Sequence, residues 1–214
     1  VLFKEQIAMK YLSILAVIFS LISCSENTEL PQGKTNIDPV VPIEIPNKSV
    51  DISVLTYNNL QSEWLLNDEL YSGYAISHYS DSTLKQKFGI FNGRKQNEAI
   101  EWYPNGTMKS ISHYHAGRLH GENKKWGADS AHILISHLNY SNGKLQGVQK
   151  KWYVTGEPFK ILNMNEGVEE GMQKAFRKNG VVFANYEAKN GRIFGMKKAA
   201  LCFDLEDEKV VYEE

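Results

Sequence analysis

Three histidines and two glutamates lie in one short stretch of the chain. These residue types could bind a metal ion or act in acid–base catalysis. His113 and His115 are two residues apart, so on a strand both project from one face, and His120 follows on the next strand. Two such histidines supply only part of a zinc site, which needs at least a third ligand and partners that orient the rings. Glu98 and Glu101 are the nearest carboxylates. Their three-residue offset places them on opposite faces of a strand, which argues against a concerted acid–base pair.

Motifs for catalysis or nucleotide binding do not accompany these side chains. The sequence has no serine in a Gly-x-Ser-x-Gly elbow, no P-loop and no Gly-x-Gly-x-x-Gly segment. We therefore predict that the protein is not an enzyme, and that it has no catalytic residues, no bound metal and no cofactor.

Large aromatic residues recurring along the chain are the second candidate for a binding site. They are Trp102, Trp126, Trp152 and Phe176. A ladder of such rings would stack on the sugar rings of a glycan. One aromatic residue per repeat is more often the packing signature of that repeat. We favour packing and keep ligand binding as the alternative.

The first 23 residues have the layout of a secretory signal peptide and are expected to form a signal helix. An apolar run at 12–22 follows Lys10 and is too short for a bilayer span, which needs about 20 residues. The run ends in Leu-Ile-Ser-Cys, which resembles the lipobox of bacterial lipoproteins. That resemblance implies cleavage before Cys24 and acylation of Cys24, which would anchor the chain in a lipid bilayer. Cys202 lies in an apolar stretch and is predicted to be a buried thiol.

Residues 24–50 differ from the rest of the chain in composition. They combine four prolines with serine, asparagine, threonine, lysine and glutamate, and they have no aromatic residue. Such a composition buries too little apolar surface to offset the entropy of ordering. We predict a Pro-rich disordered tether between the membrane and the folded body.

A hexapeptide ending in glycine recurs through the second half of the chain. It reads AGRLHG at 116–121, NGKLQG at 142–147 and NGRIFG at 190–195, and its last position recurs at spacings of 24, 24, 26, 24 and 24 residues from Gly73 to Gly195. A fixed period over six positions indicates a repeat architecture. The predicted structural glycines are Gly73, Gly93, Gly106, Gly117, Gly121, Gly143, Gly147, Gly156, Gly167, Gly171, Gly180, Gly191 and Gly195.

Each repeat has the pattern of a β-hairpin. Asn-Gly pairs favour tight turns, and apolar residues alternate with polar ones before them. One unit cannot bury its own apolar face, so neighbouring units must stabilise one another. We predict an all-β fold, an elongated single twisted antiparallel sheet of repeated hairpins over 71–198. Irregular caps are expected at 51–70 and 199–214, with 57–70 as a candidate short helix or capping segment.

The repeat resembles the MORN-type repeat in its bacterial variant form. The resemblance covers about residues 67–198 and is carried best by WYPNG at 102–106 and YSNGKLQG at 140–147. It implies successive antiparallel hairpins in one sheet. The variant occurs in secreted lipoproteins and in proteins labelled YwqK-like antitoxins. Asn97 in place of glycine is one departure from the pattern, and Gly127 in place of a second aromatic residue is another.

Charge is distributed unevenly along the chain. The net charge is −6 over residues 24–70, +9 over 71–198 and −5 over 199–214. The basic residues of the repeats would decorate a solvated sheet face, or they would meet acidic material such as lipid headgroups or a partner protein. We favour the solvated face. An export signal makes nucleic acid an improbable partner.

Together these features predict a lipoprotein of the bacterial cell envelope, lipid-anchored and facing the periplasm or the cell surface at the outer membrane. Repeat sheets present long surfaces, so the predicted function is the binding or scaffolding of a protein partner that the sequence does not identify. An envelope polysaccharide bound by the periodic aromatic residues is one alternative, and an antitoxin-like or immunity-like role is another.

Overall fold

The computed structural model describes residues 37, 39–129, 131–196, 205–206 and 209–210. The predicted signal helix, Cys24, Cys202 and most of the predicted C-terminal cap lie outside this part. The described residues are almost entirely β-structure, with one short 3-10 helix. Within them, no helix is long and apolar enough to cross a membrane.

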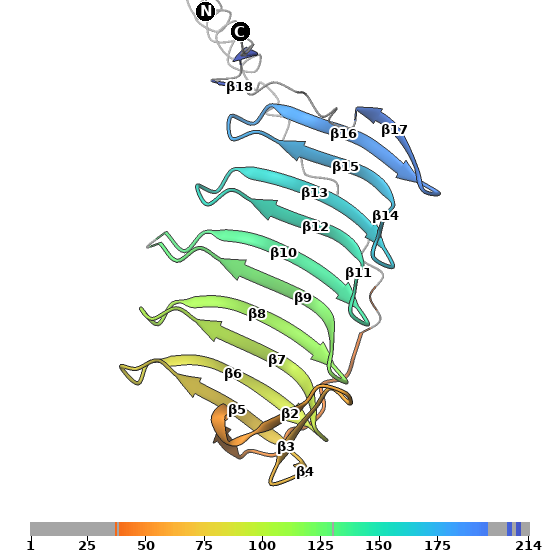
Figure 1. Cartoon of the computed structure of the whole chain (residues 1–214). Coiled ribbons are helices and arrows are strands. Elements are labelled where there is room, and N and C mark those ends of the chain that lie inside the picture. Colours follow the sequence, from red (N-terminus) through yellow and green to blue (C-terminus); the bar gives the residue numbers. More distant parts are fainter. Residues whose placement is uncertain (1–36, 38, 130, 197–204, 207–208, 211–214) are drawn as a thin grey trace, which may run out of the picture. The chain divides into compact units, whose positions relative to one another are not determined.

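The repeats form one long, mostly antiparallel sheet, as the sequence predicts (Figure 1). From β5 onward the strands lie side by side in chain order, because each hairpin pairs with the next one. The main strands are β5 (Gly73–His78), β6 (Leu84–Phe91), β7 (Arg94–Trp102), β8 (Met108–His115), β9 (Arg118–Trp126), β10 (Leu134–Ser141), β12 (Gly147–Trp152), β13 (Pro158–Asn165), β15 (Gly171–Phe176), β16 (Val182–Lys189) and β17 (Arg192–Met196). The short strands β11 (Lys144–Leu145) and β14 (Val168–Glu169) extend two of these hairpins.

The tight turns at one end of the hairpins have positive φ at both central residues. Asn142 has φ 48° and Gly143 has φ 85°, which is the geometry of a type I′ turn. The same geometry recurs at Asn92-Gly93, Ala116-Gly117, Glu166-Gly167 and Asn190-Gly191. At the other end, Gly106, Gly156 and Gly180 take positive φ after a turn. The predicted turn glycines therefore lie where the chain reverses direction.

The last glycine of the hexapeptide lies at an interruption of the strand ladder in the middle repeats. Between β10 and the strands that follow it, pairing stops at His137–Lys150 and resumes at Tyr140–Leu145. Gly147 lies in this interval with φ 72°. Each such interruption is a bulge that adds residues to one strand only, and glycine tolerates the backbone conformation it requires.

A second layer covers the first hairpin of the sheet. The predicted cap contains η2 (Ile52–Val54), β2 (Thr56–Asn58), β3 (Glu63–Leu66) and β4 (Glu69–Leu70), and these three strands form a small sheet. The Trp64 ring packs 5.5 Å from the Phe88 ring, beside buried Ala75 and Ile90. The segment is therefore a capping layer of strands and not a helix, and Trp64 and Leu66, two residues apart, both pack against the core of the first hairpin.

The tether prediction is wrong for the residues just before this layer. β1 (Ser49–Asp51) pairs in parallel with β5, and Ile45 is only 7% exposed. Ile43 donates its amide to Asn97 Oδ1 (3.2 Å), and Asn97 Nδ2 donates to the Ile43 carbonyl (2.7 Å). Ile45 is thus buried, and the main chain of Ile43 is hydrogen-bonded to the sheet. Composition alone did not reveal these contacts.

The predicted C-terminal cap is described only in part. β18 (Leu205–Glu206) and β19 (Lys209–Val210) form a two-stranded antiparallel pair. The other residues of that predicted cap lie outside the described part of the chain.

Candidate functional site

Strand register divides the side chains of the repeats between two faces. One row of directly opposed residues runs through Ile100, Ile111, Lys124, His137 and Lys150, and we call its side the histidine face. The neighbouring row in each strand points to the other side, because side chains alternate along a strand. That row contains Ala99, Ser112, Asn123 and Leu138, and we call its side the apolar face.

Every junction between the central repeats is held by a pair of hydrogen bonds at the type I′ turn. The Gly143 amide donates to the Leu119 carbonyl of the preceding repeat (2.7 Å), and the Asn142 amide donates to His120 Nδ1 (3.4 Å). The side-chain bond recurs from Asn92 to Ser72 Oγ, from Ala116 to Gln96 Oε1 and from Glu166 to Gln146 Oε1. Each turn is thus fixed by the repeat before it, as expected when neighbouring units stabilise one another.

The periodic aromatic residues take part in a second contact between repeats. The Tyr103 hydroxyl donates to the Trp126 carbonyl (2.8 Å), and the Tyr153 hydroxyl donates to the Phe176 carbonyl (2.9 Å). Tyr79 makes the same bond to Trp102 (2.8 Å). The four predicted binding aromatics are half-buried at these junctions. Among the described residues their rings do not contact one another as a ladder, and Trp126 instead stacks on His132 at 5.6 Å.

The predicted histidines lie close together and are satisfied by internal partners. His113 Nδ1 donates to the Glu122 carbonyl (2.8 Å), and its Nε2 lies 3.5 Å from Glu98 Oε1. His115 Nδ1 lies 3.1 Å from Gln96 Nε2. In the described part of the chain, no three histidine, cysteine, aspartate or glutamate side chains converge as a metal site would require.

Glu98 and Glu101 lie on opposite faces of β7, as their spacing predicts. Glu98 is opposite His113 on the histidine face, and Glu101 pairs with Lys109 at 2.9 Å on the apolar face. The two carboxylates therefore have separate partners and cannot share a proton in one reaction.

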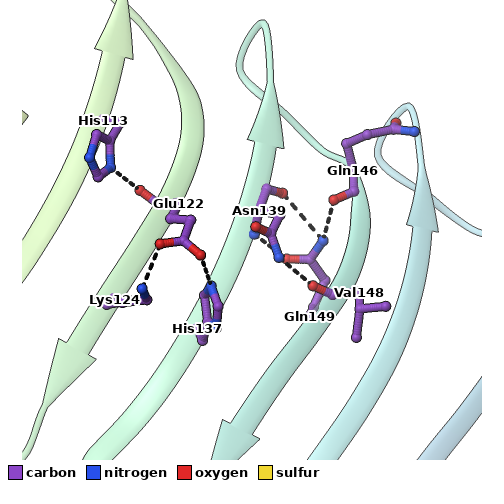
Figure 2. A network of polar contacts seen from close by, with 8 residues as sticks. All are labelled: His113, Glu122, Lys124, His137, Asn139, Gln146, Val148 and Gln149. Carbon is purple, nitrogen blue, oxygen red and sulfur yellow. Dashed lines mark hydrogen bonds and ion pairs between the residues drawn. The ribbon is translucent and has the colours of Figure 1, made fainter. Parts of the chain in front are cut away.

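One glutamate, Glu122, joins two strands on the histidine face (Figure 2). Its carboxylate accepts from Lys124 Nζ (2.5 Å) and from His137 Nε2 (3.0 Å). Burial raises the pKa of Glu122, but the hydrogen bonds from Lys124 and His137 outweigh it and the pKa falls below its ordinary value. Burial also lowers the pKa of His137, the charges of Lys124 and Lys150 act in the same direction, and Glu122 opposes them.

A glutamine closes two of the ladder interruptions in the central repeats, and Figure 2 shows one of them. Gln149 Oε1 accepts from the Asn139 amide (2.7 Å), and its Nε2 donates to the Asn139 carbonyl (3.2 Å) and the Gln146 carbonyl (3.0 Å). Asn139 Nδ2 donates in turn to the Val148 carbonyl (2.6 Å). Gln149 is 1% exposed. Its side chain therefore replaces main-chain pairing that the bulge removes.

The next repeat contains the same pair of side chains one period further along. Gln173 bonds both the amide (3.0 Å) and the carbonyl (2.8 Å) of Asn163, and it is fully buried. The sequence analysis missed this pair. The signal was present in it, because both the asparagine and the glutamine recur after 24 residues.

A groove of about 720 Å³ lies between the segment that precedes β1 and the histidine face. Pro39 and Pro42 line one side, and Glu98, His113 and His120 line the other. His113 and His120 are occupied by the hydrogen bonds described above. The groove is therefore the seam where this segment lies on the sheet, and the histidines that line it already have hydrogen-bonding partners.

A second hollow, of about 480 Å³, opens on the apolar face of β9 to β13. We call it the lysine hollow. Its walls are Leu138, Tyr140, Phe159, Lys125 and Lys151. Trp152 also lines it, and is the only one of the four predicted binding aromatics found among the residues that line it. The hollow thus combines an apolar floor with two cationic side chains.

The two lysines of this hollow and a third lysine beside them lie in one row of the sheet. Lys125 and Lys151 are exposed and flank Ser136 from the two neighbouring strands. Lys151 also lies directly opposite Lys160. In the described part of the chain, no ion pair includes any of these three lysines.

Comparison with known proteins adds no assignment: no family model, no curated protein and no solved structure matches this chain.

Proposed function

We propose that this chain is a non-enzymatic protein-binding module of the bacterial cell envelope, anchored in the membrane through acylated Cys24. In this proposal the sheet of MORN-like hairpins is the binding body, and the partner docks on the apolar face of its central repeats. The glycan-binding and antitoxin-like alternatives have no observation in the described residues that favours them over protein binding.

The observation that supports this proposal is the contrast along the apolar face. At β5 and β6 the β2–β4 layer covers Ala75, Phe88 and Ile90. At β9 to β13 the described strands form no second layer, and Leu138 and Leu162 remain half-buried with Val154 61% exposed. Apolar side chains left open on the same face of a sheet that is covered elsewhere are typical of a docking site.

The covered end of the sheet also shows which kind of chain packs on the apolar face. There the occupant is a strand layer that supplies Trp64 and Leu66 as apolar contacts. It adds hydrogen bonds at the turn, since the Trp64 amide donates to the Gly93 carbonyl (2.7 Å). A partner that presents an aromatic or aliphatic edge of extended chain would make the same kind of contact further along the sheet.

Site-specific photocrosslinking in intact cells tests the proposal. Tyr140→p-benzoylphenylalanine places the crosslinker on the apolar face, and Lys150→p-benzoylphenylalanine is the matched control on the histidine face. We expect a discrete protein adduct from the first variant only. Equal adducts from both, or none from either, would contradict the proposed docking face.

The anchor needs a separate test. Cys24→Ala should abolish labelling by radioactive palmitate and release the chain from the membrane fraction. Continued labelling would show that the lipid assignment is wrong, whatever the outcome of crosslinking.

A further inference from the structure

The lysine hollow holds positive charge that the protein itself does not neutralise. Lys125 lies on β9 and Lys151 on β12, two strands away, so their backbones are about 10 Å apart across the sheet. Lys160 stands on β13 directly opposite Lys151. Three cations therefore follow one row of the apolar face without an acidic partner in the described chain.

This arrangement costs stability in the unbound protein. Like charges placed directly opposite each other on neighbouring strands destabilise a sheet. Some lysines of the same sheet are paired, as Lys124 is with Glu122 and Lys144 with Glu166. Lys189 and Arg192 are also directly opposed, at the end of the last hairpin of the sheet, but Lys151 and Lys160 lie beside a hollow. A local rule that is broken beside a hollow is a feature expected at functional sites.

Most of the other residues that line the hollow are apolar or aromatic, with Asn123 and Ser136 as the polar exceptions. Leu138 and Tyr140 lie on one side of the lysine row, and Phe159 and Val154 on the other. The Lys160 ammonium lies 4.9 Å from the centroid of the Phe159 ring, so charge and apolar surface meet there. The ligand that complements this surface has carboxylates next to an aromatic or aliphatic side chain.

We propose that the lysine hollow binds an acidic segment of a partner protein, with carboxylates at Lys125, Lys151 and Lys160 and an apolar side chain on the floor. This inference rests on the proposed protein-binding function and adds the chemistry of the partner. It also gives the basic surface of the repeats a ligand where the sequence analysis favoured a solvated face.

Fluorescence anisotropy with a synthetic peptide tests the inference on the full chain. The probe is fluorescein-labelled Glu-Glu-Phe-Glu-Leu-Glu-Glu, and its comparison peptides replace either all glutamates by glutamine or the Phe and Leu by serine. The test variant is Lys125→Gln with Lys151→Gln. The control is Lys150→Gln with Lys174→Gln, which removes the same charge from the opposite face of the sheet.

We expect the test variant to weaken peptide binding by about tenfold, which corresponds to about 1.4 kcal/mol, and the control to change it by less than about twofold. Each comparison peptide should also bind more weakly than the probe. Equal weakening in the control would overturn the inference, since it would reveal attraction by net charge alone. Tighter binding of vesicles containing anionic phospholipid, lost in the same test variant, would overturn it in favour of a lipid surface.

The outcome is separable from that of the proposed function. If crosslinking at Tyr140 captures a partner but the peptide does not bind, the docking face stands and its acidic ligand is wrong. If neither occurs, both fail.

Discussion

The first hairpin and the central repeats use the same backbone pattern but different side chains to stabilise it. In the first hairpin, the positions that carry asparagine and glutamine further along are Gly89 and, on the paired strand, Ala99. In the third and fourth hairpins these positions are Asn139 with Gln149, and Asn163 with Gln173. The first region has layers on both faces, and the central region has none among the described strands.

The difference shows how a single-layer sheet compensates for a missing core. Small residues at Gly89 and Ala99 leave room for Ile45 on one face and for the β2–β4 layer on the other. Without such layers, the central repeats cannot rely on apolar burial. They bury amide side chains inside the bulges and satisfy every hydrogen bond there, which stabilises the sheet without a second layer.

The strongest test of this comparison removes one buried amide. Gln149→Leu keeps a side chain of similar size but leaves the amide and carbonyl of Asn139 without their side-chain partner. Unsatisfied buried polar groups are costly, so we expect a loss of about 3 kcal/mol in the free energy of unfolding, measured in urea.

The matched control is Gln86→Leu, in the covered region. Gln86 is half-buried and makes no side-chain hydrogen bond within the described chain, so this variant should change stability by less than about 0.5 kcal/mol. Equal losses in the two variants would mean that Gln149 contributes through packing and not through its hydrogen bonds.

A second test acts on the covered region. A Cβ added at Gly89 would lie 2.2 Å from Ile45 Cδ1 and 2.8 Å from the Gln96 carbonyl oxygen. We expect Gly89→Ala to cost about 2 kcal/mol, because the segment before β1 must shift away from the sheet. Hydrogen exchange should show faster exchange of the Ile43 amide.

Gly127→Ala is the comparison for that variant. Its added Cβ would meet Asp129 Oδ1 at 3.5 Å, an ordinary contact. A loss of stability as large as that of Gly89→Ala would show that the loss of a flexible glycine, and not the clash with Ile45, explains the first result.

The repeat period and the hairpin architecture were predictable from the sequence because they depend on local rules. Asn-Gly pairs determine type I′ turns, and alternating residues such as Phe88 and Ile90 determine strand faces. The bulge was also predictable, since a glycine recurs four residues after the turn. These features need no knowledge of contacts between distant segments.

The errors concern contacts between segments far apart in the chain. Ile43 and Asn97 are 54 residues apart, and nothing local reveals that an asparagine in place of glycine holds a proline-rich segment. The lysine hollow was missed for the same reason, because Lys151 and Lys160 become neighbours only once the register is known. The composition of the predicted tether is polar, but it could not reveal that two isoleucines within it contact the sheet.

A smaller effect is expected from the aromatic junctions. Tyr153→Phe removes the hydroxyl that donates to the Phe176 carbonyl and should cost about 1 kcal/mol in thermal or urea unfolding. Tyr140→Phe is the control, since the Tyr140 hydroxyl makes no hydrogen bond in the described chain. If both variants have the same stability as the wild type, contacts between the central repeats depend on the turn bonds alone.

The smallest expected effect is the pH dependence of stability that comes from the charged network of the central repeats. The pKa of His137 is lowered from 6.5 in the folded chain, mainly by burial. The unfolded state therefore binds a proton more readily, so stability is present above about pH 6.5 and is lost as the pH falls toward the folded pKa. We expect His137→Gln to flatten this part of a plot of unfolding free energy against pH. An equal slope in wild type and His137→Gln would assign the pH dependence to other groups.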